Sequence, residues 1–121
     1  MDQIFFNSDV ITLHAPLNKS TRHIINKNII DNFLLKKPVI INTARAGLVD
    51  SNAIIDGLKN YKISGYLCDV LDNEPIDKQE KLVGIQNVII TPHVGSRTYE
   101  NVEKQGIKAI QNVINFLNDW K

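Results

Sequence analysis

The 121-residue sequence predicts an α/β fold in which helices flank a parallel β-sheet. Four short runs are rich in Val and Ile and do not alternate strictly with polar residues, which is typical of strands covered on both faces. These runs are residues 10–13, 39–42, 63–70 and 88–90. Segments with helical spacing of apolar residues lie between and after them. Right-handed crossovers would then make the strands parallel.

Three helices are expected. Asn26 can cap the first, over residues 27–35, and Asp50 can cap the second, over residues 51–60. Gly47 precedes the second cap and is expected to make the tight turn from strand to helix. The last helix covers about residues 98–118. Its apolar stripe should pack against the core; the stripe consists of Val102, Gly106, Ala109, Ile110, Val113 and Leu117.

Composition and charge narrow the possible partners. Hydrophobic residues make up 43% of the chain and charged residues 22%, as in an ordinary globular domain. The formal net charge of +1 gives no field that would recruit nucleic acid or an anionic membrane surface. No apolar run approaches the roughly 20 residues that span a bilayer. Cys68 is the single cysteine, and its apolar setting suggests a core residue. We therefore expect a cytoplasmic protein with no nucleic-acid or membrane partner.

Chemically useful side chains follow three successive strands. Arg45 comes after the second strand, Asp69 and Glu74 after the third, and His93 after the fourth. In open α/β sheets, ligands bind outside the carboxyl ends of the strands, so these side chains should share one edge. A histidine can donate and accept a proton near neutral pH. An arginine can hold a carboxylate through two hydrogen bonds.

Each of these residues also has a plainer explanation. A lone histidine after a strand is usually a surface residue. An arginine in such a loop is usually a solvated charge or a partner of a helix end. Asp69 could simply cap a turn. The pattern by itself therefore leaves a catalytic cluster and a chance grouping as open alternatives.

Four sequence blocks resemble the D-isomer-specific 2-hydroxyacid dehydrogenases, in particular the phosphoglycerate and glycerate dehydrogenase branch. The blocks are SDVITLHAPL (8–17), VIINTARAGLVD (39–50), GYLCDVLDNEP (65–75) and NVIITPHVGS (87–96). The resemblance implies the C-terminal half of a Rossmann-like parallel sheet with flanking helices, an incomplete NAD-binding domain. It also implies an oxidoreductase that interconverts a (2R)-hydroxy acid and a 2-oxo acid by hydride transfer. NAD is the expected cofactor, with NADP as an alternative.

The resemblance implies a role for each matching residue. Arg45 would bind the substrate carboxylate and carbonyl. His93 would exchange a proton with the substrate oxygen, and Glu74 would pair with His93. No metal is expected, the substrate would be a small 2-hydroxy or 2-oxo acid, and the protein should be a homo-oligomer. The residues expected to contact the cofactor are Ala15, Pro16, Thr21, Thr43, Ala44, Arg45, Asp69, His93 and Gly95.

One feature of the family pattern is not found. The six glycines, at positions 47, 57, 65, 84, 95 and 106, form no G-x-G-x-x-G, the loop that cradles a pyrophosphate. We therefore expect residues 1–121 to be a partial NAD-binding domain, without the glycine-rich segment and the substrate domain, and inactive alone. Two alternatives stay open: an NAD-sensing, corepressor-like binding module of the same family, and an inactive truncated remnant.

Overall fold

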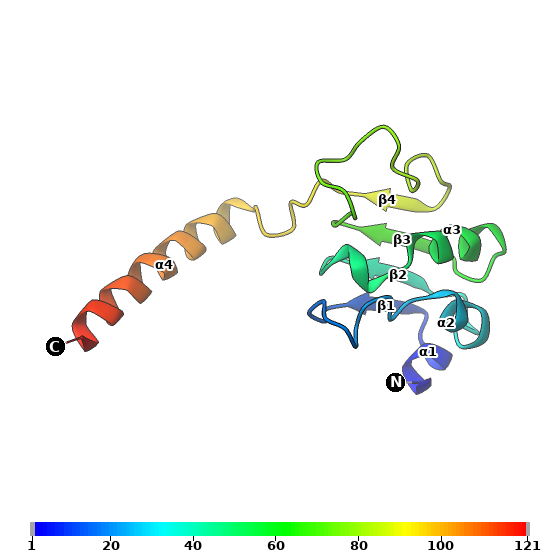
Figure 1. The fold of residues 1–121 in the computed structure, drawn as a ribbon, viewed down its shortest axis with the longest axis horizontal. Coiled ribbons are helices and arrows are strands. Elements are labelled where there is room, and N and C mark those ends of the chain that lie inside the picture. The colour runs from blue at the N-terminus through cyan, green and yellow to red at the C-terminus, as the bar shows by residue number, and fades with distance from the viewer. Residues whose placement is uncertain (1, 121) are drawn as a thin grey trace.

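The computed structural model describes residues 2–120, which contain one four-stranded parallel sheet (Figure 1). The strands lie in chain order: β1 (Val10–Leu13), β2 (Val39–Asn42), β3 (Gly65–Cys68) and β4 (Val88–Ile90). The predicted α/β class and parallel sheet are confirmed. The bounds of β1, β2 and β4 match those expected from the apolar runs, and β3 is shorter at both ends than the run that predicted it.

The strand register aligns the carboxyl ends of all four strands. Leu13 pairs with Asn42, Asn42 with Cys68, and Cys68 with Ile90. The loops that follow these residues therefore leave the sheet along one edge. This edge is where the sequence predicts the chemically useful side chains.

Two helices cross between the strands and cover one face of the sheet. In α2 (Lys27–Asn32) the Asn26 side chain accepts a hydrogen bond from the first turn, and in α3 (Ser51–Lys59) Asp50 does the same. Both predicted caps are confirmed. However, α2 ends three residues before the expected bound, because Phe33 already leaves helical geometry.

The core fills the space between the sheet and these helices. Its least exposed members come from strands, helices and the loops between them. Four of them have no exposed surface: Ile25, Ile40, Leu48 and Ile54. Cys68 is also buried, as expected, and burial raises the pKa of its thiol to about 11, which keeps it protonated and unreactive at neutral pH.

A short N-terminal helix was not expected. In α1 (Asp2–Asn7), Phe5 is buried and Phe6 packs against Phe33, with their ring centroids 5.3 Å apart. Six residues are too few to show helical periodicity, so the pattern did not reveal it.

Gly47 does lie in the connection between β2 and α3, within a short 3₁₀ helix (Ala46–Leu48). Its φ is not positive, so the expected conformational reason is wrong. Instead, a Cβ on Gly47 would lie 3.0 Å from Leu17 Cδ2. A side chain at this position would therefore require the Leu17 side chain to shift.

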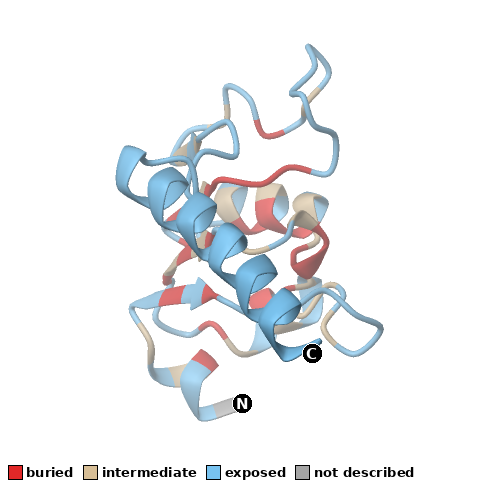
Figure 2. Cartoon of the chain, turned by 90° about the vertical axis from the view of Figure 1, so that its left-hand side faces the viewer, coloured by how far each residue is buried: buried red, intermediate tan, exposed pale blue. Residues whose placement is uncertain are grey.

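The last helix, α4 (Tyr99–Asp119), extends away from the sheet and is exposed along its whole length (Figures 1 and 2). Thr98 caps it by accepting a hydrogen bond from the Asn101 N–H. The expectation that its apolar stripe packs on the core is wrong: Ile110, for example, is 64% exposed. No helix within residues 2–120 combines the length and apolar character needed to cross a bilayer.

Candidate active site

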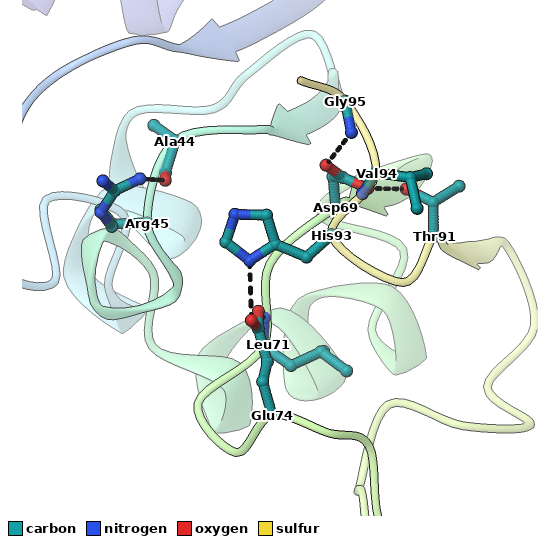
Figure 3. A network of polar contacts seen from close by, with 9 residues as sticks. All are labelled: Ala44, Arg45, Asp69, Leu71, Glu74, Thr91, His93, Val94 and Gly95. Carbon is teal, nitrogen blue, oxygen red and sulfur yellow. Dashed lines mark hydrogen bonds and ion pairs between the residues drawn. The ribbon is translucent and has the colours of Figure 1, made fainter. Parts of the chain in front are cut away.

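His93 and Glu74 form an ion pair at the carboxyl edge of the sheet (Figure 3). The distance from His93 Nδ1 to Glu74 Oε2 is 2.7 Å. The other carboxylate oxygen, Oε1, accepts a hydrogen bond of 2.9 Å from the Leu71 N–H. The Leu71 N–H, together with the His93 contact, holds the pKa of Glu74 below its usual range. Glu74 is therefore an anion whose orientation is fixed by its own loop.

This pairing leaves one nitrogen of His93 for other chemistry. Because Glu74 is an acceptor, Nδ1 of His93 is assigned as the donor, which fixes the ring orientation. In the view of Figure 3, the second ring nitrogen points away from Glu74, toward the side on which Ala44 and Arg45 lie. The His93 side chain is 45% exposed, so a small molecule can reach it.

Arg45 lies in the loop after β2, on the neighbouring part of the same edge. Its Nη1 donates a hydrogen bond of 2.6 Å to the Ala44 carbonyl (Figure 3). A guanidinium carries five N–H donors, so this bond leaves donors for a ligand. Among residues 2–120, no hydrogen bond or ion pair joins Arg45 to His93 or Glu74.

Asn42 builds the loop that carries Arg45, and it was not singled out from the sequence. Its side chain has no exposed surface. The amide donates to the Arg45 carbonyl at 2.9 Å and accepts from the Ala44 N–H at 3.2 Å. The sequence signal that could have revealed Asn42 is a polar residue at the end of an otherwise apolar strand. A buried amide at such a position must find hydrogen-bond partners in the following loop.

Asp69 is only 6% exposed and contacts the loop that carries His93. Its carboxylate accepts hydrogen bonds from the Thr91 hydroxyl, the Val94 N–H at 2.9 Å and the Gly95 N–H at 2.8 Å (Figure 3). Burial raises the pKa of Asp69, but these three hydrogen bonds outweigh it and hold the pKa below its usual range. Thr91 is a second site residue that the sequence did not reveal.

The predicted cofactor residues after β1 lie in a compact loop. The Thr21 hydroxyl donates to the Pro16 carbonyl at 2.6 Å and accepts from the Asn18 N–H at 2.9 Å. Ala15 is half-buried and Pro16 is exposed. Thr21 thus shapes the loop, and its contact with a cofactor stays a prediction.

The same edge also carries the remaining residues that the sequence assigns to the cofactor. Thr43 and Ala44 follow β2 and Gly95 lies in the loop after β4, so they share the edge with His93, and their contact with a cofactor stays a prediction. In the described residues 2–120, no three His, Cys, Asp or Glu side chains converge in a way that could hold a metal ion.

Known proteins with similar sequences point to one family. Residues 1–95 match the model of the D-isomer specific 2-hydroxyacid dehydrogenase, NAD binding domain. A hydroxypyruvate reductase of Thermotoga maritima is 36% identical over 115 residues, covering 93% of this chain and 37% of the relative. A D-3-phosphoglycerate dehydrogenase of Methanocaldococcus jannaschii is 37% identical over 113 residues, covering 93% of this chain and 21% of the relative.

Solved structures agree with the sequence comparison. A D-lactate dehydrogenase with NAD+ from Lactobacillus jensenii superposes with a TM-score of 0.86 at 29% identity, covering 98% of this chain and 39% of that protein. This chain thus spans well under half of the length of such relatives. Because the family match covers most of the residues, the chain belongs to the D-isomer specific 2-hydroxyacid dehydrogenase family, within its NAD-binding domain.

Proposed function

We propose that this chain supplies the proton-transfer and carboxylate-binding groups of an NAD-dependent oxidoreductase that interconverts a (2R)-hydroxy acid and a 2-oxo acid. One observation carries the proposal: the 2.7 Å pair between His93 and Glu74, at the edge where Arg45 also lies. A histidine oriented by a carboxylate, next to an arginine fork, suits a substrate that has a carboxylate beside a carbonyl.

In the direction of reduction, His93 Nε2 donates a proton to the carbonyl oxygen while the carbonyl carbon receives a hydride. The imidazole then regains its proton from water. In oxidation, Nε2 accepts the hydroxyl proton. Glu74 keeps the ring in one orientation in both directions, because its carboxylate accepts from Nδ1. A nicotinamide supplies or accepts the hydride when it is bound.

Arg45 would hold the substrate carboxylate. Two parallel N–H donors of a guanidinium match the two oxygens of a carboxylate, which fixes the orientation of the adjacent carbonyl. Asn42 supports this role indirectly, because it holds the Arg45 backbone through a hydrogen bond of 2.9 Å. Positioning of this kind accounts for a large share of the rate enhancement in two-substrate reactions.

The remaining predicted contacts would hold the cofactor. Thr43, Ala44 and Gly95 would border the nicotinamide, and Ala15, Pro16 and Thr21 would line the adenosine and phosphate portion. The structures similar to this chain include proteins with NAD+ and with NADPH. We propose NAD as the cofactor and NADP as the alternative. Because the sequence has no G-x-G-x-x-G, we expect weak NADH affinity and no turnover from these 121 residues alone.

The relatives described above carry the names of reductases and dehydrogenases, which favours the enzyme over a corepressor-like module. We also propose a cytoplasmic location, since the single free cysteine suits a reducing compartment. The exposed apolar stripe of α4 supports a homo-oligomer. Light scattering should then give a mass above the 13.7 kDa of one chain, and a monomeric mass would refute this part.

Nuclear magnetic resonance can test the site directly. The ¹⁵N-labelled chain would be titrated with NADH and then with oxamate, a stable analogue of a 2-oxo acid. Amide shifts should change at residues 43–45 and 93–95 and stay constant along α4. The substitution Arg45→Lys should weaken oxamate binding by about tenfold, because a lysine cannot form the paired hydrogen bonds.

Arg22→Lys is the matched control, since Arg22 is an exposed arginine in the loop between β1 and α2. This variant should bind oxamate as the unmodified chain does. Shift changes confined to other regions, or equal affinity in the Arg45→Lys variant, would overturn the proposal.

A further inference from the structure

One buried carboxylate holds both ends of the turn that carries His93. The Thr91 hydroxyl and the Val94 N–H donate to Asp69 Oδ1, and the Gly95 N–H donates to Oδ2. Thr91 lies two residues before His93, and Gly95 two residues after it. Asp69 therefore holds residues on both sides of His93, and no hydrogen bond joins it to the imidazole itself (Figure 3).

The turn needs such support, because the backbone of His93 is in the left-handed region. Its φ is +53°, a backbone conformation that residues other than glycine seldom adopt. The His93 N–H also donates back to the Thr91 carbonyl at 3.0 Å, which closes a tight turn. A strained backbone of this kind persists only when the surrounding contacts determine it.

Gly95 shows how closely the carboxylate and the turn are packed. A Cβ at this position would lie 2.9 Å from Asp69 Oδ2, closer than two such atoms can approach. The Asp69 side chain is itself buried, so it has little room to withdraw. The glycine therefore permits the third hydrogen bond, and a larger residue would break it.

The family resemblance assigns Asp69 to the cofactor, but its acceptor capacity is already largely used. A carboxylate has about four acceptor positions, and donors from the turn occupy three of them here. We propose that Asp69 is a positioning residue, which, with Thr91 and Gly95, holds His93 in the orientation that pairs it with Glu74.

This inference rests on the proposed function only in taking His93 as the proton-transfer residue. The coupling between Asp69 and the His93–Glu74 pair is a property of these residues, and it can be measured without any catalytic activity. A failure of the coupling and a failure of the proposed function are therefore distinguishable.

The first test replaces Asp69 with asparagine in the 121-residue chain. Whichever way the amide is turned, its NH₂ group faces at least one N–H or O–H donor of the turn, so at least one hydrogen bond is lost. Hydrogen exchange of the Val94 or Gly95 amide should accelerate by about tenfold or more. In the ¹⁵N spectrum of the His93 ring, the fraction with the proton on Nδ1 should fall at least about twofold.

Asp72→Asn is the matched control, because Asp72 also follows β3 but makes no hydrogen bond with residues 91–95. It should leave both the amide exchange and the ring tautomer unchanged. A purely structural role for Asp69 would lower stability and leave the tautomer of the folded molecules as it was, and that outcome would overturn the proposal.

Thr91 offers a milder pair of variants in case Asp69→Asn does not fold. Thr91→Val keeps the shape and removes the hydroxyl, and should accelerate exchange of the Val94 amide by about fivefold. Thr91→Ser keeps the hydroxyl and should restore slow exchange and the Nδ1 tautomer. Equal behaviour of the two variants would contradict the inference, because the hydroxyl is the feature that distinguishes them.

Discussion

The sheet body, which is the four strands with α2 and α3, and helix α4 both carry many apolar residues, yet only the sheet body buries them. Ile40 in β2 has no exposed surface, whereas Ile110 in α4 is 64% exposed. The strands and α4 form close to the expected positions. The side chains that cap α2, α3 and α4 all make their hydrogen bonds. The difference teaches that a periodic pattern specifies an element, while the surroundings decide what that element packs against.

The largest expected contrast is between two isoleucine substitutions. Ile40→Ala should lower the free energy of unfolding by about 3 kcal/mol, because it removes buried methyl groups and leaves a cavity. In dilute, monomeric protein, Ile110→Ala should change it by less than about 0.5 kcal/mol, because the side chain is exposed in the single chain. Urea denaturation measures both. Similar losses in the two variants would mean that α4 is packed in solution.

A second contrast compares two asparagines. Asn42→Ala leaves the Ala44 N–H and the Arg45 carbonyl without their partners and should cost about 2 kcal/mol. Asn112→Ala, on exposed α4, should be neutral or slightly stabilising, since alanine favours helix. The same urea experiment applies. A neutral Asn42→Ala would show that the Arg45 loop does not depend on the buried amide.

A smaller effect is expected from pH. The folded state holds the pKa of Asp69 and of Glu74 below their usual ranges. Each carboxylate therefore contributes stability that is present above about pH 4 and is lost as the pH falls through the lowered folded-state pKa. The urea midpoint should drop as the pH is lowered below 4.

The variant Asp69→Asn should reduce this acid sensitivity, whereas Asn112→Ala, which alters no ionisable group, should keep it. An unchanged acid dependence in Asp69→Asn would contradict the low pKa of that carboxyl and the three hydrogen bonds that cause it.

The sequence predicts much of the sheet because apolar runs directly encode buried strands. It misses α1, where six residues are too few for periodicity. It also predicts α2 three residues too long, since Leu34 is apolar and buried but lies beyond the last helical turn. The packing of α4 could not be predicted, because an amphipathic stripe reads the same with or without a partner.

The candidate site divides in a similar way. The strand-end rule and the family resemblance anticipated the edge that holds Arg45, Glu74 and His93, and the structure pairs the last two. The roles of Asn42 and Thr91 depend on hydrogen bonds to residues distant in the sequence or to loop backbone, such as the bond from Thr91 to Asp69. Such contacts leave little trace in a pattern of residue types.

The most direct test of the proton-transfer role uses a chimera. This chain would replace the matching 115-residue segment of the Thermotoga maritima hydroxypyruvate reductase, and turnover of hydroxypyruvate with NADH would be measured. His93→Gln should lower kcat by at least about 100-fold relative to the unmodified chimera, because it removes the proton donor. His23→Gln is the control, because His23 lies in the loop between β1 and α2, and it should stay within about twofold. Equal turnover in the His93→Gln and unmodified chimeras would contradict the account.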